Sequence, residues 1–417
     1  MQVSLSKGDC LTPGHANPTI KRVFSQPGVI RLRRLFSLLG VSAAGLLLVL
    51  LLLEAGVRIF APQNPDFWDS SAIRRYQAAP PHFVENIPNA RANYTGVPVS
   101  INSLGLRGDE VVIPKPAGTF RILGVGDSVT FGHGVRAEET FLKVLEQRLN
   151  ESLAGKVHYE ALNAASPGGG LADYDRFLRN KSAILQPDMV IVGLALNDIL
   201  IYREETKLSV AEAEWENTRL PLARKINRFF LRHSHLYMFC FSKFKGLLYQ
   251  KGLLDINQLQ GQNFLTLAPP SPLQAKAWAS SFRMLSKIKA FCEEHKYRLV
   301  VVVFPLQMQL SAEQMQFYRD NYHLRLGTEA LSGEPQKVLA SFTETNGIEM
   351  IDLLPLFKDR SRELLYLKSE IIPSDPTHFS AAGHRVVADA LLARLRIVSS
   401  NPTNALNPST VKPVPLP

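Results

Sequence analysis

The chain has 417 residues, of which 46% are hydrophobic and 20% charged, and its net charge is +10. This composition excludes a disordered or fibrous protein and predicts a sizeable folded core. The basic residues form no stripe interleaved with aromatic residues, so we expect no nucleic-acid partner. The three cysteines are too far apart in the sequence to indicate a disulfide framework or a zinc site.

The first predicted element is a membrane-spanning helix over residues 35–57, where Glu54 is the only charge. A bilayer is crossed by a helix of roughly 20 apolar residues. The apolar run is longer than that of a usual signal peptide, and no small-residue cleavage site follows it. Residues 1–34 are polar and basic, so the positive-inside rule predicts a flexible cytoplasmic N-terminus and an extracytoplasmic remainder, periplasmic or extracellular.

Residues 58–118 are rich in Pro, Asn and Gly and predict a β-poor linker or small cap. Beyond them we expect one domain over residues 119–400. Its short β-branched runs alternate with amphipathic stretches, which is typical of an α/β fold, a doubly wound parallel sheet in three layers. The predicted strands are 120–125, 157–162, 189–196, 299–304 and 348–353. Functional residues of such folds lie at the carboxyl ends of the strands.

Two further segments interrupt or follow this pattern. Residues 199–280 form a long insertion with clustered aromatic and basic residues. The insertion is either an ordinary helix packed on the core or an amphipathic helix lying on a membrane surface. Residues 401–417 contain five prolines and predict a disordered tail.

A serine stands where the first predicted strand ends, in the run Gly126-Asp127-Ser128. A nucleophile at this position would be exposed at the edge of the sheet. The same tripeptide also suits an ordinary turn between a strand and a helix. The motif therefore needs support from the other strand ends.

Two further strand ends carry groups that can stabilise negative charge. The second strand runs into Ser166-Pro167-Gly168-Gly169-Gly170, where glycine lets a backbone N–H point toward a ligand. The third strand ends at Asn197, whose side chain offers an amide. The alternatives are a plain turn for the glycines and a helix cap for the asparagine.

Near the C-terminus, Asp375 precedes His378 by three residues, and Ser380 is a good N-cap for the helix that follows. A carboxylate at this spacing can turn back and hold the imidazole in one tautomer. His384 lies within that helix and is expected to be structural. His133 is close to Ser128 in sequence but has no adjacent carboxylate.

The order Ser, Gly, Asn and Asp-x-x-His over residues 119–396 resembles all four blocks of the SGNH (GDSL-type) hydrolase family. The segment Asn102–Gly108 is similar to one that often precedes the domain in membrane-anchored members. The resemblance implies a flavodoxin-like fold with Ser128 as nucleophile, His378 as general base and Asp375 as its orienter. It also implies an oxyanion hole made by the N–H groups of Ser128 and Gly168 and the side chain of Asn197. This scheme requires no metal and no organic cofactor.

The sequence departs from the family pattern in two places. The third block has Ala195 where the family usually has Gly, which would narrow the floor of the pocket. The second block has three consecutive glycines, so Gly169 is an alternative to Gly168. Thr130 stands where the Gly-x-Ser-x-Gly elbow requires its last glycine, which argues against an α/β-hydrolase fold.

The resemblance leaves several functions open. A serine acyl-enzyme supports either hydrolysis of an ester or transfer of the acyl group to another hydroxyl, and the predicted location makes an envelope glycan or lipid the expected substrate. A phospholipase is a further possibility if the insertion lines an apolar channel. The alternative is a non-catalytic binding or assembly protein of an envelope polysaccharide system that retains the fold. Protein partners cannot be predicted.

Overall fold

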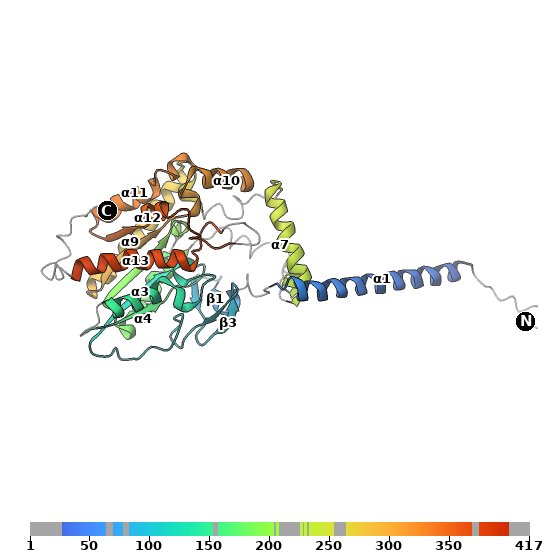
Figure 1. Cartoon of the computed structure of the whole chain (residues 1–417), viewed down its shortest axis with the longest axis horizontal. Helices are drawn as coiled ribbons and strands as arrows, with labels where there is room; N and C mark the ends of the chain where they lie inside the picture. Colours follow the sequence, from blue (N-terminus) through green and yellow to red (C-terminus); the bar gives the residue numbers. More distant parts are fainter. Residues whose placement is uncertain are drawn as a thin grey trace, which may run out of the picture.

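The computed structural model describes residues 27–63, 70–77, 83–152, 157–203, 206–207, 226–227, 229–231, 233–253, 264–368 and 375–399 (Figure 1). The predicted disordered tail, residues 401–417, lies outside this part of the chain. So do residues 1–26 of the predicted cytoplasmic segment.

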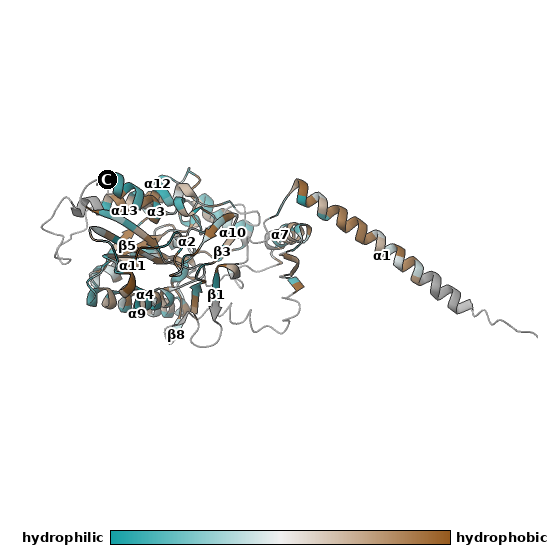
Figure 2. Ribbon diagram, turned by 90° about the horizontal axis from the view of Figure 1, so that it is seen from below, coloured by the Kyte–Doolittle hydropathy of each residue, from teal (hydrophilic) through white to brown (hydrophobic). Residues whose placement is uncertain are grey.

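A single long helix, α1 (Pro27–Phe60), projects from the folded domain, and Figure 2 shows its largely hydrophobic surface. Its stretch Phe36–Phe60 is long and apolar enough to cross a membrane and is not buried against the protein. The helix begins eight residues before the predicted start at residue 35. Residues 27–34 are therefore helical and not an irregular lead, because Pro27 suits a first helical turn and the basic residues after it are good helix formers.

Five parallel strands form the central sheet, in the order β11-β10-β7-β5-β6. They are β5 (Thr119–Gly126), β6 (His158–Asn163), β7 (Met189–Ala195), β10 (Arg298–Phe304) and β11 (Glu349–Asp352). The second strand of this sheet, β6, lies on one side of the first, β5. The strands β7, β10 and β11 extend the sheet on the other side of β5, as in flavodoxin-like sheets. The predicted doubly wound fold is confirmed.

Helices cover both faces of the sheet. One face carries α3 (Phe141–Ser152), α12 (Leu354–Asp359) and α13 (Ala381–Ser399). The other carries α4 (Leu171–Leu185), α9 (Pro272–Glu294) and α11 (Glu334–Thr345). Along β7, Met189 and Ile191 face the first layer while Val190 and Val192 face the second, so every position of the strand is buried.

The segment before the domain contains β-structure, contrary to the prediction of a β-poor linker. Two antiparallel hairpins form there, β1 (Arg74–Gln77) with β2 (Phe83–Asn86) and β3 (Arg91–Tyr94) with β4 (Val97–Ser100). Each strand has only four residues, and β4 contains Pro98, a residue that is rare within strands. The sequence signal for these strands is therefore weak. The turn residues Thr95 and Gly96 both have positive φ, as a tight hairpin turn requires.

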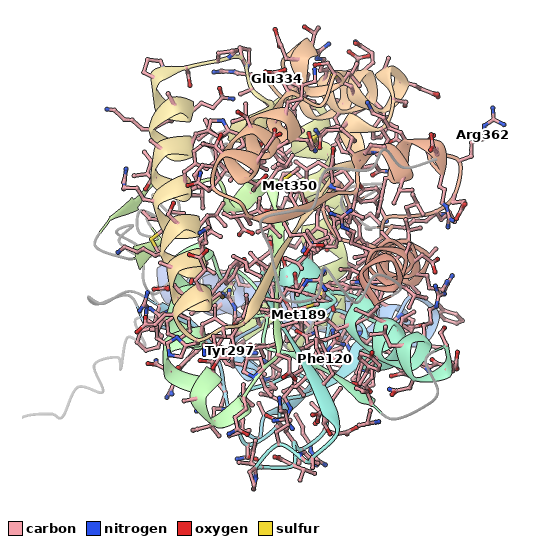
Figure 3. All side chains as sticks on the ribbon, turned by 90° about the vertical axis from the view of Figure 1, so that its left-hand side faces the viewer. Phe120, Met189, Tyr297, Glu334, Met350 and Arg362 are labelled. Carbon is pink, nitrogen blue, oxygen red and sulfur yellow. The ribbon has the colours of Figure 1, made fainter. Side chains whose placement is uncertain are left out.

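The hairpins pack on the edge of the sheet where the strands end. A separate buried cluster joins Ile73, Tyr94, Val99 and Ile101 to Phe131, which follows the first strand of the sheet. In Figure 1 these hairpins lie on the side of the domain that faces α1. Figure 3 views the opposite side and labels Phe120 and Met189, at the amino ends of β5 and β7. The carboxyl edge of the sheet therefore faces the same side as α1.

The insertion contributes α7 (His235–Gln250), which contacts α1 and α10 (Ala312–Tyr322). A small ribbon pairs β8 (Tyr202–Arg203) with β9 (Thr206–Lys207). The remaining described elements are the short helix α2 (Ser128–Phe131) and the 3-10 turns Ser70–Ala72, Ala137–Glu139, Leu196–Asp198, Leu265–Leu267, Gln307–Gln309 and Thr328–Ala330.

Candidate active site

The first group at the carboxyl edge is Ser128, the first residue of α2. Asp127 ends the extended segment and caps α2, because its Oδ1 accepts a 2.8 Å hydrogen bond from the Val129 N–H. This abrupt change from strand to helix leaves the Ser128 side chain half-buried at the sheet edge. The local sequence thus presents a hydroxyl where a substrate can reach it.

The structure brings Ser128, His378 and Asp375 into one hydrogen-bonded chain. The Ser128 hydroxyl lies 2.8 Å from His378 Nε2, although the two residues are 250 positions apart. His378 Nδ1 lies 2.7 Å from Asp375 Oδ2. Asp375 Oδ1 accepts the N–H groups of Thr377 and His378 at 2.9 and 3.0 Å, which fixes the carboxylate within its own turn. This is the geometry of a nucleophile, a base and the group that orients the base.

The electrostatics of the pair suit a base. Burial raises the pKa of Asp375, but its hydrogen bonds and the neighbouring imidazole outweigh this effect and lower the pKa to about 2. Burial also disfavours the charged form of His378, yet the Asp375 carboxylate outweighs it and raises the imidazole pKa above its usual value. The carboxylate is therefore ionised at neutral pH and strengthens the proton affinity of His378.

The glycine turn after β6 lies beside the end of β5, because the Ser166 N–H donates to the Gly126 carbonyl at 3.0 Å. Gly168 has a φ of 76°, a conformation that favours glycine. The Gly169 N–H already donates a 2.9 Å hydrogen bond to the Ser166 carbonyl within this turn. Gly168 and Gly169 both remain candidates for the donor to a bound oxyanion.

Asn197 lies in the 3-10 turn after β7 and is half-buried. Its Nδ2 donates to Asp127 Oδ2 at 3.1 Å, so the residue before the nucleophile orients the amide. An amide nitrogen carries two protons, and the second can serve another acceptor. Asp127 therefore connects the first and third motif blocks, a role that the sequence did not indicate.

Arg107, in the segment upstream of the domain, is a further residue whose role the sequence did not show. Its buried guanidinium donates to the Phe131, Gly132 and Val135 carbonyls, the last two at 2.7 and 2.6 Å. The backbone N–H of Arg107 donates to the Asn163 carbonyl at 2.9 Å. The only signal was the similarity of the run Asn102–Gly108 to a segment that often precedes the domain in membrane-anchored members. Arg107 holds the loop after Ser128 against the turn after β6.

His133 lies in that loop, and its ring stacks on the His378 ring at a centroid distance of 4.0 Å. The Tyr94 ring meets the His133 ring edge-on at a centroid distance of 5.3 Å. Burial, together with the charge of His378, lowers the pKa of His133 well below its usual value. A neutral His133 therefore packs against the imidazole and limits its orientation.

His133, Asp375 and His378 are also close enough to hold a metal ion. However, the His378 nitrogens face Ser128 and Asp375, and both Asp375 oxygens accept hydrogen bonds within the same turn. These bonds match the serine–imidazole–carboxylate arrangement. The chemistry described below uses no metal.

Two other predicted positions are structural. His384 is fully buried in α13, and its Nδ1 accepts the Phe141 N–H at 3.3 Å. Burial lowers its pKa to about 3, so it stays neutral. The Ala195 side chain is buried in the core of the face that carries α3 and α13, so its contribution is core packing, whereas the sequence predicted a narrowed pocket floor.

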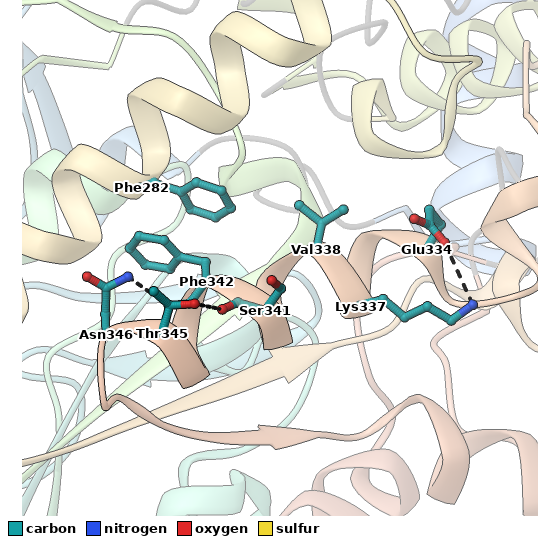
Figure 4. A pocket seen from close by; sticks show the side chains of 8 residues that line it. All are labelled: Phe282, Glu334, Lys337, Val338, Ser341, Phe342, Thr345 and Asn346. Carbon is teal, nitrogen blue, oxygen red and sulfur yellow. Dashed lines mark hydrogen bonds and ion pairs between the residues drawn. The ribbon is translucent and has the colours of Figure 1, made fainter.

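Figure 4 shows a surface hollow between α9 and α11, remote from these residues. Phe282 and Phe342 stack at a centroid distance of 4.1 Å, and Glu334 pairs with Lys337 at 3.7 Å. No residue of the Ser128 site lines this hollow. It is a groove between two helices and does not belong to the candidate active site.

A flavodoxin-like sheet with a Ser–His–Asp chain at its carboxyl edge defines a protein of the serine-hydrolase class. The chain belongs to the GDSL-like lipase/acylhydrolase family, whose model matches residues 122–391, well over half of the sequence. No curated protein matches it in sequence. The family implies an acyl ester as substrate.

Three solved structures are similar to this chain over about two thirds of its length. Axe2, an acetylxylan esterase from Geobacillus stearothermophilus, is 14% identical with a TM-score of 0.36 and covers 66% of this chain and 94% of its own. An α/β hydrolase enzyme from the metagenome of Lake Arreo, Spain, is 14% identical with a TM-score of 0.35 and the same coverage. A lipolytic G-D-S-L family protein from Veillonella parvula is 10% identical with a TM-score of 0.32 and covers 66% and 97%.

Proposed function

We propose that the protein is a membrane-anchored serine esterase or O-acyltransferase that forms an acyl-enzyme on Ser128. The observation that carries the proposal is the continuous hydrogen-bonded chain from Ser128 through His378 to Asp375. A hydroxyl is a weak nucleophile until a base accepts its proton. The raised pKa of His378 supports its role as that base.

In the first step, His378 Nε2 takes the hydroxyl proton while Ser128 Oγ bonds to the ester carbonyl carbon. The carbonyl oxygen becomes an oxyanion, which the N–H groups of Ser128 and Gly168 and the amide of Asn197 stabilise. When the C–O bond to the leaving alcohol breaks, His378 returns the proton to that alcohol. Asp375 keeps the imidazole in the required tautomer throughout.

In the second step, water or a second hydroxyl attacks the acyl-enzyme, with His378 again accepting a proton. Attack by water gives hydrolysis, and attack by a sugar hydroxyl gives acyl transfer. Both reactions use the same residues, so the acceptor alone distinguishes them. When the acyl bond to Ser128 Oγ breaks, His378 returns the proton to Oγ, and the site is restored.

We place the site outside the cytoplasm. The basic residues Arg31, Arg33 and Arg34 precede the apolar part of α1, and cytoplasmic flanks of a membrane span are enriched in Lys and Arg. An acyl ester of an envelope glycan or lipid is the substrate that such a location would offer. The carboxyl edge of the sheet faces the same side as α1, which supports a substrate close to the bilayer.

The test uses the full-length protein in detergent with a fluorophosphonate probe and p-nitrophenyl acetate, beside Ser128→Ala and His378→Ala. We expect labelling and ester turnover in the wild type and neither in the Ser128 variant. A folded wild-type protein that resists the probe and hydrolyses no ester would support the non-catalytic binding or assembly protein. With turnover established, adding a glycan acceptor separates the two reactions, because transfer yields an acylated glycan and hydrolysis yields free acid.

A further inference from the structure

Helix α7 has two contrasting faces. Met238, Ser242 and Gly246 are buried on one face. The opposite face, at helical spacing, exposes Cys240, Phe244 and Leu247, with Phe244 61% and Leu247 48% exposed. A soluble helix normally turns such residues inward and exposes polar ones. The outward face of α7 is therefore apolar where water alone would favour charge.

Basic and aromatic residues surround this apolar face. Lys243 is exposed on α7, and Lys251 is exposed in the turn that directly follows the helix. Just before the helix, Phe229 and Phe230 are 56% and 42% exposed. Lysines beside exposed Phe and Leu are typical of helices that lie in the interface of a bilayer with anionic lipids.

Glu54, the single acid of the apolar segment, fastens α7 to α1. Its two carboxylate oxygens accept the N–H groups of His235 and Leu236, both at 2.9 Å. The Ser234 hydroxyl donates to the same carboxylate at 2.7 Å. These donors belong to the first turn of α7, where an anion satisfies otherwise unpaired N–H groups. A charge inside the predicted span thus has a structural function at the end of α1.

Two further bonds reinforce this junction. Arg58 Nη2 donates to the His233 carbonyl at 2.8 Å, and the Gln63 N–H donates to His235 Nδ1 at 2.8 Å. In Figure 1, α7 consequently runs across the C-terminal end of α1 instead of continuing its direction. If α1 crosses a bilayer, α7 lies along the surface of that bilayer.

We infer that α7 is an interfacial helix that inserts its Phe244 and Leu247 face into the extracytoplasmic leaflet, with Lys243 and Lys251 at anionic lipid headgroups. The inference rests on the proposed membrane span of α1. A bilayer is the occupant that this position favours, because the bonds from Glu54 place the first turn of α7 beside the end of the predicted span. Ile59 and Phe60, in the last turn of α1, are 70% and 87% exposed and add apolar surface at the same junction.

The experiment measures depth in the membrane with the full-length chain in vesicles of phosphatidylcholine and phosphatidylglycerol. The three native cysteines are replaced by Ser, and single cysteines carry an NBD fluorophore. Phe244→Cys and Leu247→Cys probe α7, Leu48→Cys probes the span, and Leu364→Cys is the matched control because Leu364 is an equally exposed apolar residue of the catalytic domain, 66% exposed. Quenching by lipids with a doxyl group near the headgroup or deep in the acyl chain reports the depth of each label.

We expect the labels at 244 and 247 to be quenched by the shallow doxyl lipid about threefold more than the label at 364. In the wild type, we expect this quenching to increase with the fraction of phosphatidylglycerol. The Lys243→Glu, Lys251→Glu double variant should not show this increase. Quenching at 48 without quenching at 244 and 247 would overturn the inference and leave the anchor intact. A label at 48 that no doxyl lipid quenches would instead refute the membrane span itself. The turnover of p-nitrophenyl acetate reports on the Ser128 site separately. NBD signals at 244 that depend on protein concentration and not on doxyl lipid would assign the face to a second copy of the chain.

Discussion

The two loops that carry the proposed catalytic groups are held in different ways. The Ser128 loop is fixed by distant side chains: Arg107 binds three of its carbonyls, and Asn163 binds two. The Asp375–His378 pair is held largely within its own turn, since Asp375 binds the backbone and the ring there, and the Gln307 N–H adds a distant contact by donating to the Pro376 carbonyl at 2.8 Å. The nucleophile therefore depends on the N-terminal cap, whereas the base and its orienter form a local unit. Substitutions in the cap should disturb the first loop more than the second.

The largest expected effect tests the local unit formed by Asp375 and His378. Asp375→Asn removes the charge that orients His378 and stabilises its protonated form. We expect kcat to fall by roughly 10³- to 10⁴-fold with little change in stability of the fold. Steady-state kinetics with p-nitrophenyl acetate provide the measurement. A variant with more than a tenth of wild-type turnover would remove Asp375 from the catalytic unit.

Asn197→Ala tests the turn beside the Ser128 loop, because Asn197 binds Asp127 and would also donate to the proposed oxyanion. Loss of one oxyanion donor costs roughly 10²- to 10³-fold in kcat. We expect that loss without a large change in KM. Asn197→Asp is the matched control of similar size, and its added negative charge should reduce kcat further. Unchanged turnover in Asn197→Ala would contradict the assignment.

The pH profile of kcat/KM follows from the His378 pair. The base must be neutral, so activity should rise about tenfold per pH unit until pH passes the raised pKa of His378. The acidic limb should therefore end above the ordinary histidine pKa of about 6.5. Residual activity of Asp375→Asn should show this limb at lower pH, because the charge that raises the pKa is gone. A limb that does not move would assign the titration to another group.

The Ser128 loop is tested through Arg107, which touches no reacting atom. Arg107→Met leaves the three loop carbonyls without their donor, and we expect a loss of about 3 kcal/mol in the free energy of unfolding. We also expect a several-fold lower kcat with unchanged KM. Arg107→Lys should recover part of both, as a single ammonium can reach fewer carbonyls. Urea unfolding and kinetics at a temperature where both variants are folded separate the two effects.

The smallest effect concerns the helix that follows His378. Ser380 Oγ accepts the Gly383 N–H at 3.3 Å and caps α13 as predicted. Ser380→Ala should lower the free energy of unfolding by about 1 kcal/mol. Ester turnover should stay within about twofold of the wild-type value, because the Asp375 turn does not depend on the Ser380 N-cap of α13. A large loss of activity would show that the local unit is less independent than its contacts indicate.

These two regions also explain what the sequence could predict. The positions of the five sheet strands along the chain, the Asp375-x-x-His378 turn and the Ser380 cap depend on periodicity and short spacing, and the sequence predicted all of them. The roles of Arg107, Asp127 and Glu54 depend on contacts across many residues, such as the 180 positions between Glu54 and Ser234. The hairpins of the cap were missed because four-residue strands give too little alternation to recognise.

The short connection between α1 and the cap has a consequence for how the protein would find its substrate. The chain from Phe60 to Ser70 can extend at most about 35 Å, at about 3.5 Å per residue. With α1 in a bilayer, the Ser128 site would search a thin layer along the membrane and not the whole volume beyond it. The encounter becomes two-dimensional, and an ester confined to the same layer is met at a far higher effective concentration than a freely diffusing one.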